Sequence, residues 1–179
     1  MFIVLKMAIM RHQNKYSLTA RLLHWASALV IMWATLSGFM ITLPGTSEHT
    51  KELIAHFNVA LTALFIPFFC WRVIHRMLKG APVYNVLSNK EALLAKVVHI
   101  ILYLLVGVVL FSGLLMMDQD IVVFNVFKLD PLVQNASWIN MFKSLHEFTT
   151  RLLAAGIVLH LLALVKHEIV GHKILTRMV

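Results

Sequence analysis

Charged residues are scarce in this chain of 179 residues: they make up 13% of it, while hydrophobic residues make up 60%. A soluble domain carries roughly 25% charged residues. So few charges cannot cover a globular protein of this length, which favours a surface that faces lipid. Cysteine is almost absent too. Cys70 stands alone, which excludes a disulfide within the chain and argues against a cysteine-based metal or iron–sulfur site.

The basic residues lie beside long apolar runs, so the net charge of +8 indicates membrane topology rather than nucleic-acid binding. Crossing the hydrocarbon core takes about 20 residues of helix. Three stretches without Asp, Glu, Lys or Arg are of about that length or longer. They predict membrane spans at about Leu18–Leu43, Leu53–Ile74 and Ala92–Met117.

A fourth span is predicted at Ser144–Val165, although this stretch contains Glu147 and Arg151. Its charge-free part, Leu152–Val165, is short enough for a buried helix of a soluble protein. Beside three other spans, however, charges near one end of a helix can reach the membrane interface. The residues 118–143 are then an outer loop. The predicted fold is an all-α integral membrane protein, a four-transmembrane-helix up-down bundle.

Basic residues are distributed unevenly over the two sides of these spans, with twelve on one side and four on the other. The positive-inside rule therefore predicts that both termini are cytoplasmic. We expect a cytoplasmic N-terminal segment at 1–16, a membrane domain at 17–168 and a cytoplasmic tail at 169–179. The first ten residues are apolar but short and contain Lys6, so no signal peptide is expected; Met7 and Met10 are alternative starts.

Histidines inside the spans are the main candidates for function, because an ionisable residue within a membrane is costly. At a rise of ~1.5 Å per residue, His24 and His160 lie at similar depths near the cytoplasmic side, and His56 and His146 lie at similar depths near the outer side. His146 and His160 are 14 residues apart, which places them on nearly the same face of one helix.

This geometry fits two stacked haems, each held between two imidazoles, with electron transfer as the chemistry left when both axial positions are filled. Other readings remain open. Single histidines in spans are often packing or hydrogen-bonding residues, and a transporter could use them as a proton relay. A zinc or di-metal site is disfavoured, because no carboxylate lies at the same depth in mid-membrane; Glu147, adjacent to His146, points about 100° away from it. His99 lies level with His24 and His160 and could replace either.

Several short motifs, in order, resemble the bacterial di-haem cytochrome b561 family over roughly Asn14–Met178. They are Tyr16–Ser17 with Leu23–His24–Trp25, Arg72-x-x-x-Arg76, Gly113–Met117, Lys143–Glu147 followed by His160, Lys166–His167 and Leu175-x-Arg177–Met178. The resemblance implies a bacterial inner-membrane protein of respiratory electron transport that binds two b-type haems.

The resemblance further implies that the haem-iron ligands are His24 with His160 on the cytoplasmic side and His56 with His146 on the outer side. It makes His99 a non-ligand near the inner haem, within reach of a propionate. Arg151 departs from the small polar residue common in the family. It can contact a propionate of the outer haem or pair with Glu147 one turn back, and the second interpretation is favoured.

Members of the family exchange electrons with quinone, and some are thought to oxidise superoxide while reducing ubiquinone. Ubiquinone and the bilayer are thus the expected partners here, and superoxide:quinone oxidoreductase activity is an extension. The outer segments carry four basic and six acidic residues, which gives no support to the capture of an anion. The alternative function is a membrane-anchor cytochrome subunit that relays electrons for a soluble dehydrogenase or hydrogenase.

Overall fold

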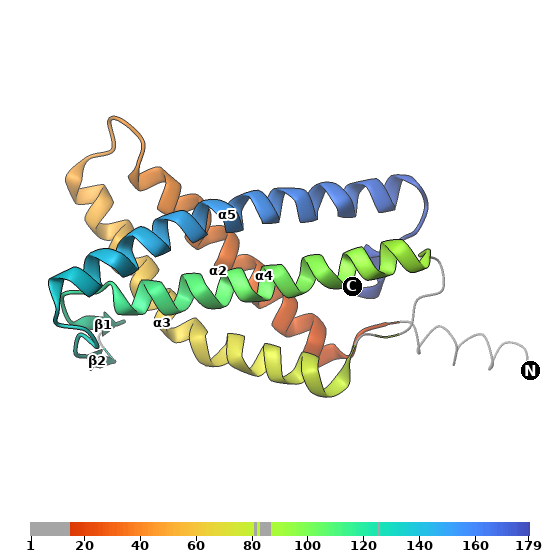
Figure 1. Cartoon of the computed structure of the whole chain (residues 1–179), viewed down its shortest axis with the longest axis horizontal. Coiled ribbons are helices and arrows are strands. Elements are labelled where there is room, and N and C mark those ends of the chain that lie inside the picture. The colour runs from red at the N-terminus through yellow and green to blue at the C-terminus, as the bar shows by residue number, and fades with distance from the viewer. Residues whose placement is uncertain (1–14, 81, 83–86, 125) are drawn as a thin grey trace, which may run out of the picture.

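The computed structural model describes residues 15–80, 82, 87–124 and 126–179. In this part of the chain it has four long helices: α2 (Leu18–Ile41), α3 (Glu48–Lys79), α4 (Asn89–Leu115) and α5 (Ala136–Ile169). Each is long and apolar enough to cross a membrane. Successive helices run in opposite directions (Figure 1). The predicted four-span up-down bundle is therefore confirmed, while most of the expected N-terminal segment, residues 1–14, lies outside the described residues.

The segment predicted as an outer loop contains regular structure, which the sequence interpretation missed. Strands β1 (Ile121–Val123) and β2 (Phe127–Leu129) form an antiparallel hairpin with Ile121 opposite Leu129. The hairpin packs against α3, and Val123 is 1% exposed. Helix α5 then begins at Ala136 rather than near Ser144, because the Asn135 side chain accepts hydrogen bonds from the first turn. The last part of the predicted loop, Ala136–Lys143, is therefore helical.

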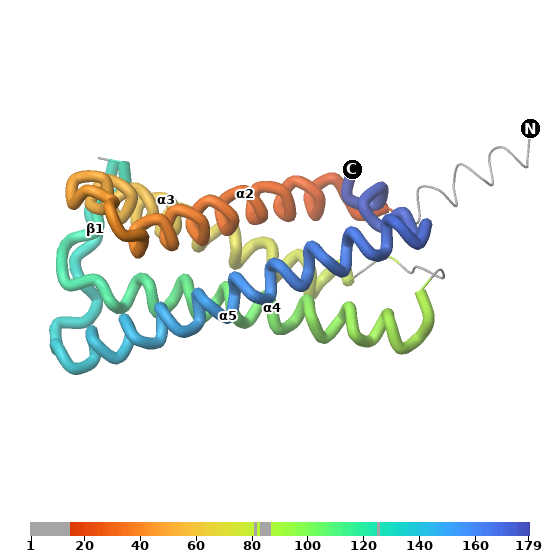
Figure 2. The backbone as a smooth tube through the Cα atoms, turned by 90° about the horizontal axis from the view of Figure 1, so that it is seen from above, coloured from red at the N-terminus to blue at the C-terminus, as the bar shows by residue number. Residues whose placement is uncertain are grey.

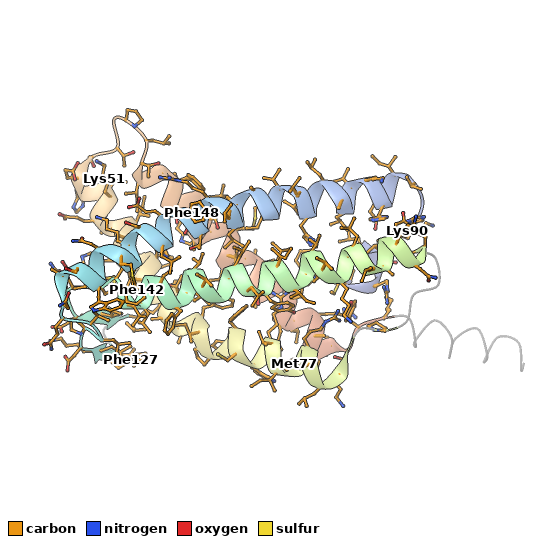
Figure 3. All side chains as sticks on the ribbon, in the orientation of Figure 1. Lys51, Met77, Lys90, Phe127, Phe142 and Phe148 are labelled. Atoms are coloured by element: carbon orange, nitrogen blue, oxygen red, sulfur yellow. The ribbon has the colours of Figure 1, made fainter. Side chains whose placement is uncertain are left out.

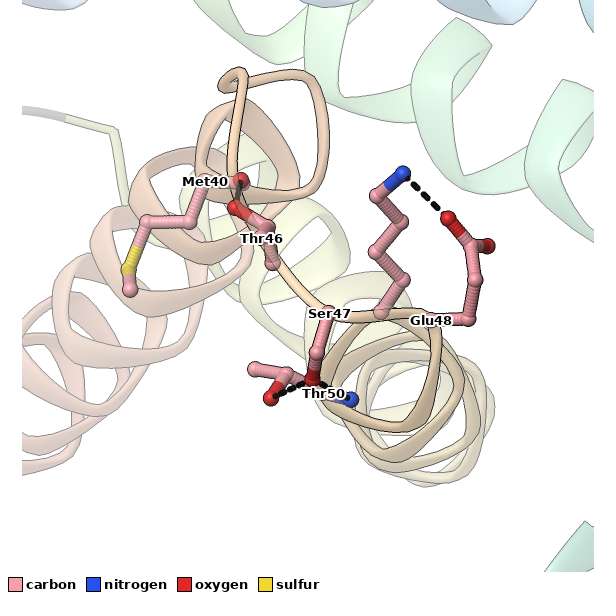
Figure 4. A network of polar contacts seen from close by, with 6 residues as sticks. Met40, Thr46, Ser47, Glu48 and Thr50 are labelled. Carbon is pink, nitrogen blue, oxygen red and sulfur yellow. Dashed lines mark hydrogen bonds and ion pairs between the residues drawn. The ribbon is translucent and has the colours of Figure 1, made fainter.

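Serine side chains cap the other three helices. Ser17, Ser47 and Ser88 each accept a backbone N–H from the first turn of α2, α3 and α4. Figure 4 shows the turn from α2 into α3, where the Thr46 hydroxyl donates to the Met40 carbonyl (3.0 Å) and Lys51 pairs with Glu48 (2.8 Å). These local contacts end one span and start the next within a few residues.

The helices associate as two pairs. Helix α2 packs along α3 and α4 packs along α5, while α3 touches α4 less extensively and α5 approaches α2 and α3 only marginally. Figure 2 shows α2 on the opposite side of the bundle from α4 and α5. The buried centre consists of Phe65, Phe69, Val106 and Leu153. Helix α5 therefore makes little close contact with the α2/α3 pair.

Apolar side chains cover the outside of the bundle, as Figure 3 shows around the labelled Met77 and Phe148. Met77 is 79% and Ile169 81% exposed. A continuous apolar surface of this extent would cause aggregation in water, whereas it is the expected surface toward lipid tails. The chain is therefore a multi-pass membrane protein.

A polar network between α2 and α3 lies within the spans. The Trp33 indole N–H donates to Asn58 Oδ1 (3.1 Å), and Asn58 Nδ2 donates to the Ser37 hydroxyl (2.8 Å). Ser37 is 3% exposed. Hydrogen bonds between membrane helices contribute to their association, so this network holds α3 against α2 in a fixed rotation.

Replacing Asn58 by leucine is expected to destabilise the bundle by about 1 kcal/mol, because both interhelical hydrogen bonds are lost. Unfolding of the purified protein in detergent would measure the change. Thr62→Val is the matched control, since the Thr62 hydroxyl donates only within its own helix, to the Asn58 carbonyl (2.7 Å). Equal stability losses in the two variants would show that the network does not link the helices.

Candidate functional site

Each of the four helices contributes one polar side chain to a cluster near the end of the bundle where the chain terminates. These residues are His24 on α2, Arg72 on α3, His99 on α4 and His160 on α5. His24 Nδ1 lies 3.1 Å from Arg72 Nη2. The rings of His99 and His160 meet edge to face with their centres 5.3 Å apart, and both lie within electrostatic range of His24. The structure thus gathers three histidines that the sequence placed at one depth.

Arg72 is the member of this cluster that sequence reasoning did not place. Its Nε donates to the Tyr103 hydroxyl (3.2 Å), and its guanidinium lies over the Tyr103 ring (5.2 Å). Within the described residues, ion pairs form at Lys51–Glu48 and Lys128–Asp120, so Arg72 has no carboxylate partner there. A half-buried cation in a membrane span calls for a counter-charge. The cluster is therefore suited to an anionic group.

A pocket opens beside the cluster toward the C-terminal tail, and its walls include His24, Arg72, Arg76, His99, Tyr103 and Met178. The tail is fixed at this position by the Trp25 indole, which donates to the Met178 carbonyl (2.9 Å). Tyr16 lies beneath two guanidiniums, those of Arg76 and Arg177. Nearby, Arg21 Nε is buried without an acceptor in the described part of the chain. The surroundings of the pocket are therefore strongly cationic.

His146 stands at the other end of α5 and packs against α4. Its Nδ1 lies 3.0 Å from the Val109 carbonyl, which can only accept, so the ring proton is on Nδ1 and the Nε2 lone pair is available to a metal. His99 has the same arrangement, with Nδ1 at 2.6 Å from the Ala95 carbonyl. His24 differs, because an arginine only donates and therefore leaves the proton of a neutral His24 on Nε2.

In the described part of the chain, two predicted site residues, His56 and Arg151, do not bond to the residues with which the sequence analysis paired them. His56 is exposed on α3, and among the described residues its ring forms neither a hydrogen bond nor a ring contact with His146. Arg151 is exposed on α5 and does not pair with Glu147 in the part of the chain that the structure describes, so the favoured Glu147–Arg151 ion pair is wrong. An exposed pair gains about 0–1 kcal/mol, too little to hold two long side chains together.

The model of the prokaryotic cytochrome b561 family matches residues 15–179, from the start of the described chain to its end. The chain is a member of the prokaryotic cytochrome b561 family. This confirms the resemblance noted in the sequence, and it makes the protein a membrane b-type cytochrome that functions in electron transfer. A comparison with curated proteins found no match.

Three features of this cytochrome b561 fit a bound haem. The candidate ligands are imidazoles, which can be neutral and in that form coordinate iron. Helices α2 and α3, which carry two of the candidate ligands, make little close contact with α5, which carries the other two. Arg72 and the buried Arg21 Nε lack anionic partners among the described residues, and haem carries two propionates that can supply them. His24 fits once Arg72 exchanges its imidazole contact for such a carboxylate.

Gly113 of α4 allows the His146 ring to lie close to the helix backbone in this cytochrome b561. A Cβ at this position would be 3.0 Å from His146 Cε1 and 3.2 Å from Nδ1. Gly113→Ala should therefore tilt the ring and shift the midpoint potential or ligand-field signature of one haem component. Gly38→Ala is the control, because a Cβ there meets nothing within 4 Å. Identical redox titrations of both variants would exclude a role for His146 near haem.

Proposed function

We propose that this cytochrome b561 holds two b-type haems, one near each face of the bacterial inner membrane, and exchanges electrons with the quinone pool. The observation that carries the proposal is the inner cluster. Imidazoles from both helix pairs converge there around Arg72, a cation within the spans that has no carboxylate partner in the described residues. Such a cluster suits a planar, iron-containing group that bears carboxylates.

In this proposal, His24 and His160 hold the inner group, and His56 and His146 hold the outer one. Helix α5 would contribute one ligand to each group, and the α2/α3 pair would contribute the other. A b-type haem with two imidazole ligands supplies a one-electron Fe(III)/Fe(II) couple with no open position for oxygen. The Val109 carbonyl orients the His146 ring through its Nδ1 proton.

Arginines provide the positive charge for the propionates. At the inner site Arg72 lies against His24, and Arg21 stands less than one helical turn before His24 on α2; both lack anionic partners in the part of the chain that the structure describes. At the outer site Arg151 follows His146 by five residues and is not held by Glu147. We therefore propose Arg151 as a contact of the outer propionates, in place of the ion pair first favoured.

His99 is proposed as a neighbour of the inner haem rather than a ligand. Its ring lies against His160 and its Nδ1 binds the Ala95 carbonyl. His99→Leu should therefore leave the haem-to-protein ratio unchanged and shift the inner midpoint potential. A loss of about half of the haem would instead make His99 an axial ligand and displace His24 or His160 from that role.

Both termini are proposed to be cytoplasmic. The structure places the start of α2, the end of α3, the start of α4 and the end of α5 at one end of the bundle (Figure 1). These are the ends beside most of the Lys and Arg residues. Residues 1–16 and 169–179 then lie in the cytoplasm and 17–168 form the membrane domain, with α5 ending at Ile169.

Quinone is favoured over superoxide as the redox partner. Among the outer cations, Lys51 pairs with Glu48 and Lys128 pairs with Asp120, and the hydrogen bond from Lys128 to Asp120 raises the pKa of Lys128 above its usual value. These paired cations add little attraction for a small anion. The inner pocket, in contrast, combines aromatic, cationic and apolar walls next to the histidine cluster.

Quinone exchange can be tested with the haem-loaded protein in liposomes. The haem is first reduced with dithionite, and the excess dithionite is removed. A ubiquinone analogue should then re-oxidise the haem, which is seen as the loss of the low-spin ferrous α-band. Ferricyanide serves as the control oxidant. Re-oxidation by ferricyanide but not by the quinone would reject quinone exchange while leaving haem binding in place.

A further inference from the structure

Three metal-ligating side chains meet at the cytoplasmic end of α4 and α5, away from the histidine cluster described above. They are Glu91 in the first turn of α4, His167 in the last turn of α5 and His172 in the tail. One ligand atom from each lies within 4.8 Å of the other two, and all three residues are half-buried. The imidazole Nδ1 atoms of His167 and His172 are 3.0 Å apart.

The end of α5 is shaped so that the two histidines converge. Gly171 has a φ of +92°, the left-handed conformation in which glycine commonly ends a helix. The chain turns back, and the backbone N–H of His172 donates to the His167 carbonyl (2.9 Å). The two rings are then nearly parallel, with their centres 5.2 Å apart and an interplanar angle of 26°. The turn thus positions both Nδ1 atoms on one side.

The carboxylate of Glu91 is fixed by its role in starting α4. Its Oε2 accepts from the backbone N–H of Ser88 (2.9 Å) and from the Ser88 hydroxyl (2.8 Å). This capping box holds the carboxylate in place at the helix start. A ligand that is already ordered loses less entropy when it binds a cation.

We propose that Glu91, His167 and His172 form a binding site for a divalent transition-metal cation, with Zn²⁺ as the best match. Two imidazoles and one carboxylate form a known zinc donor set that leaves a fourth position for water. Tetrahedral zinc with bonds of ~2.05 Å places its ligand atoms about 3.3 Å apart. The spacings of 3.0 Å and at most 4.8 Å bracket that value, so small side-chain rotations complete the site.

The site connects α4, α5 and the tail, and the tail ends beside the inner pocket. Met178 lines that pocket, and its carbonyl accepts from the Trp25 indole. Metal binding would therefore fix the tail over the pocket. The inference does not depend on the proposed haem ligands or on quinone exchange, because none of the three residues belongs to either site.

Metal binding can be measured with the full-length, haem-loaded protein in detergent after treatment with a chelator. Titration with Zn²⁺ against a chromophoric chelator should show one tight site per chain. His172→Ala and Glu91→Gln should each weaken this site by roughly tenfold or more, since even outer-shell changes commonly weaken metal sites tenfold. His49→Ala is the control, because His49 is an exposed histidine at the opposite end of the bundle.

Glu91→Gln separates a metal ligand from a folding residue. A glutamine oxygen can still accept from Ser88, so the start of α4 is kept while the charged ligand is lost. An unchanged haem spectrum with weakened zinc binding supports the site. Zinc binding of equal strength in the unaltered protein and in His172→Ala, Glu91→Gln and His49→Ala, or no stoichiometric binding at all, would overturn it.

Discussion

Replacing His146 by alanine is expected to lower the haem content of the purified protein by about half, because an outer haem would lose one of its two axial ligands. The ring is held against α4 by the Val109 carbonyl, which binds Nδ1 and leaves Nε2 out of this hydrogen bond. The inner cluster, which includes His160 on the same helix, would keep its haem. The ratio of haem to polypeptide, measured as the pyridine haemochrome, gives the result directly.

His49→Ala provides the control for this experiment, since His49 is exposed in the first turn of α3 and no ligand role is proposed for it. The remaining haem in His146→Ala should titrate as a single redox component. Full haem content in His146→Ala would reject the outer ligand assignment. Complete loss of haem from a protein that is still folded would show that the two sites are not independent.

Replacing Arg72 by leucine is expected to lower the midpoint potential of the inner haem by several tens of millivolts. A nearby cation stabilises the reduced state, which carries one more electron, so its removal disfavours reduction. A unit charge at ~8 Å contributes about 2 kcal/mol at an effective dielectric constant of about 20. Partial screening in a pocket that reaches the membrane surface reduces this figure.

Arg72→Lys separates the charge from the shape of the side chain. It keeps a cation at this position but cannot reproduce both the contact with His24 and that with the Tyr103 hydroxyl. The lysine variant should therefore recover most of the potential. A redox titration in which Arg72→Leu leaves both components unchanged would contradict the placement of haem beside this residue.

The spans were predictable because the bilayer dictates both the length and the composition of a helix that crosses it. The basic residues at the span ends predict how the bundle is oriented in the membrane, and this orientation stays a prediction. The start of α5 was not predictable in the same way, because Ala136–Lys143 extends beyond the charge-free part and depends on the Asn135 cap. The β1–β2 hairpin was not predicted either, because so short a pair of strands depends on packing against α3 for its stability.

For the site, helical rise alone placed His24, His99 and His160 at one depth, and the structure brings these residues together. Spacing could not reveal that Arg72 lies among them, because its contacts with His24 and Tyr103 join three different helices. The spacing of Glu147 and Arg151 allowed an ion pair that the structure lacks within its described residues. Neighbours within a helix can be listed from sequence, but their side-chain directions depend on tertiary surroundings.

The central claim is that one four-helix chain holds a haem near each face of the membrane. The ratio of haem to polypeptide in the unaltered purified protein, determined together with a redox titration of the ferrous α-band, tests this claim most directly. The account predicts two haems per chain that titrate as two low-spin components. Purified, folded protein with no haem, or with a single haem that titrates as one component, would contradict it.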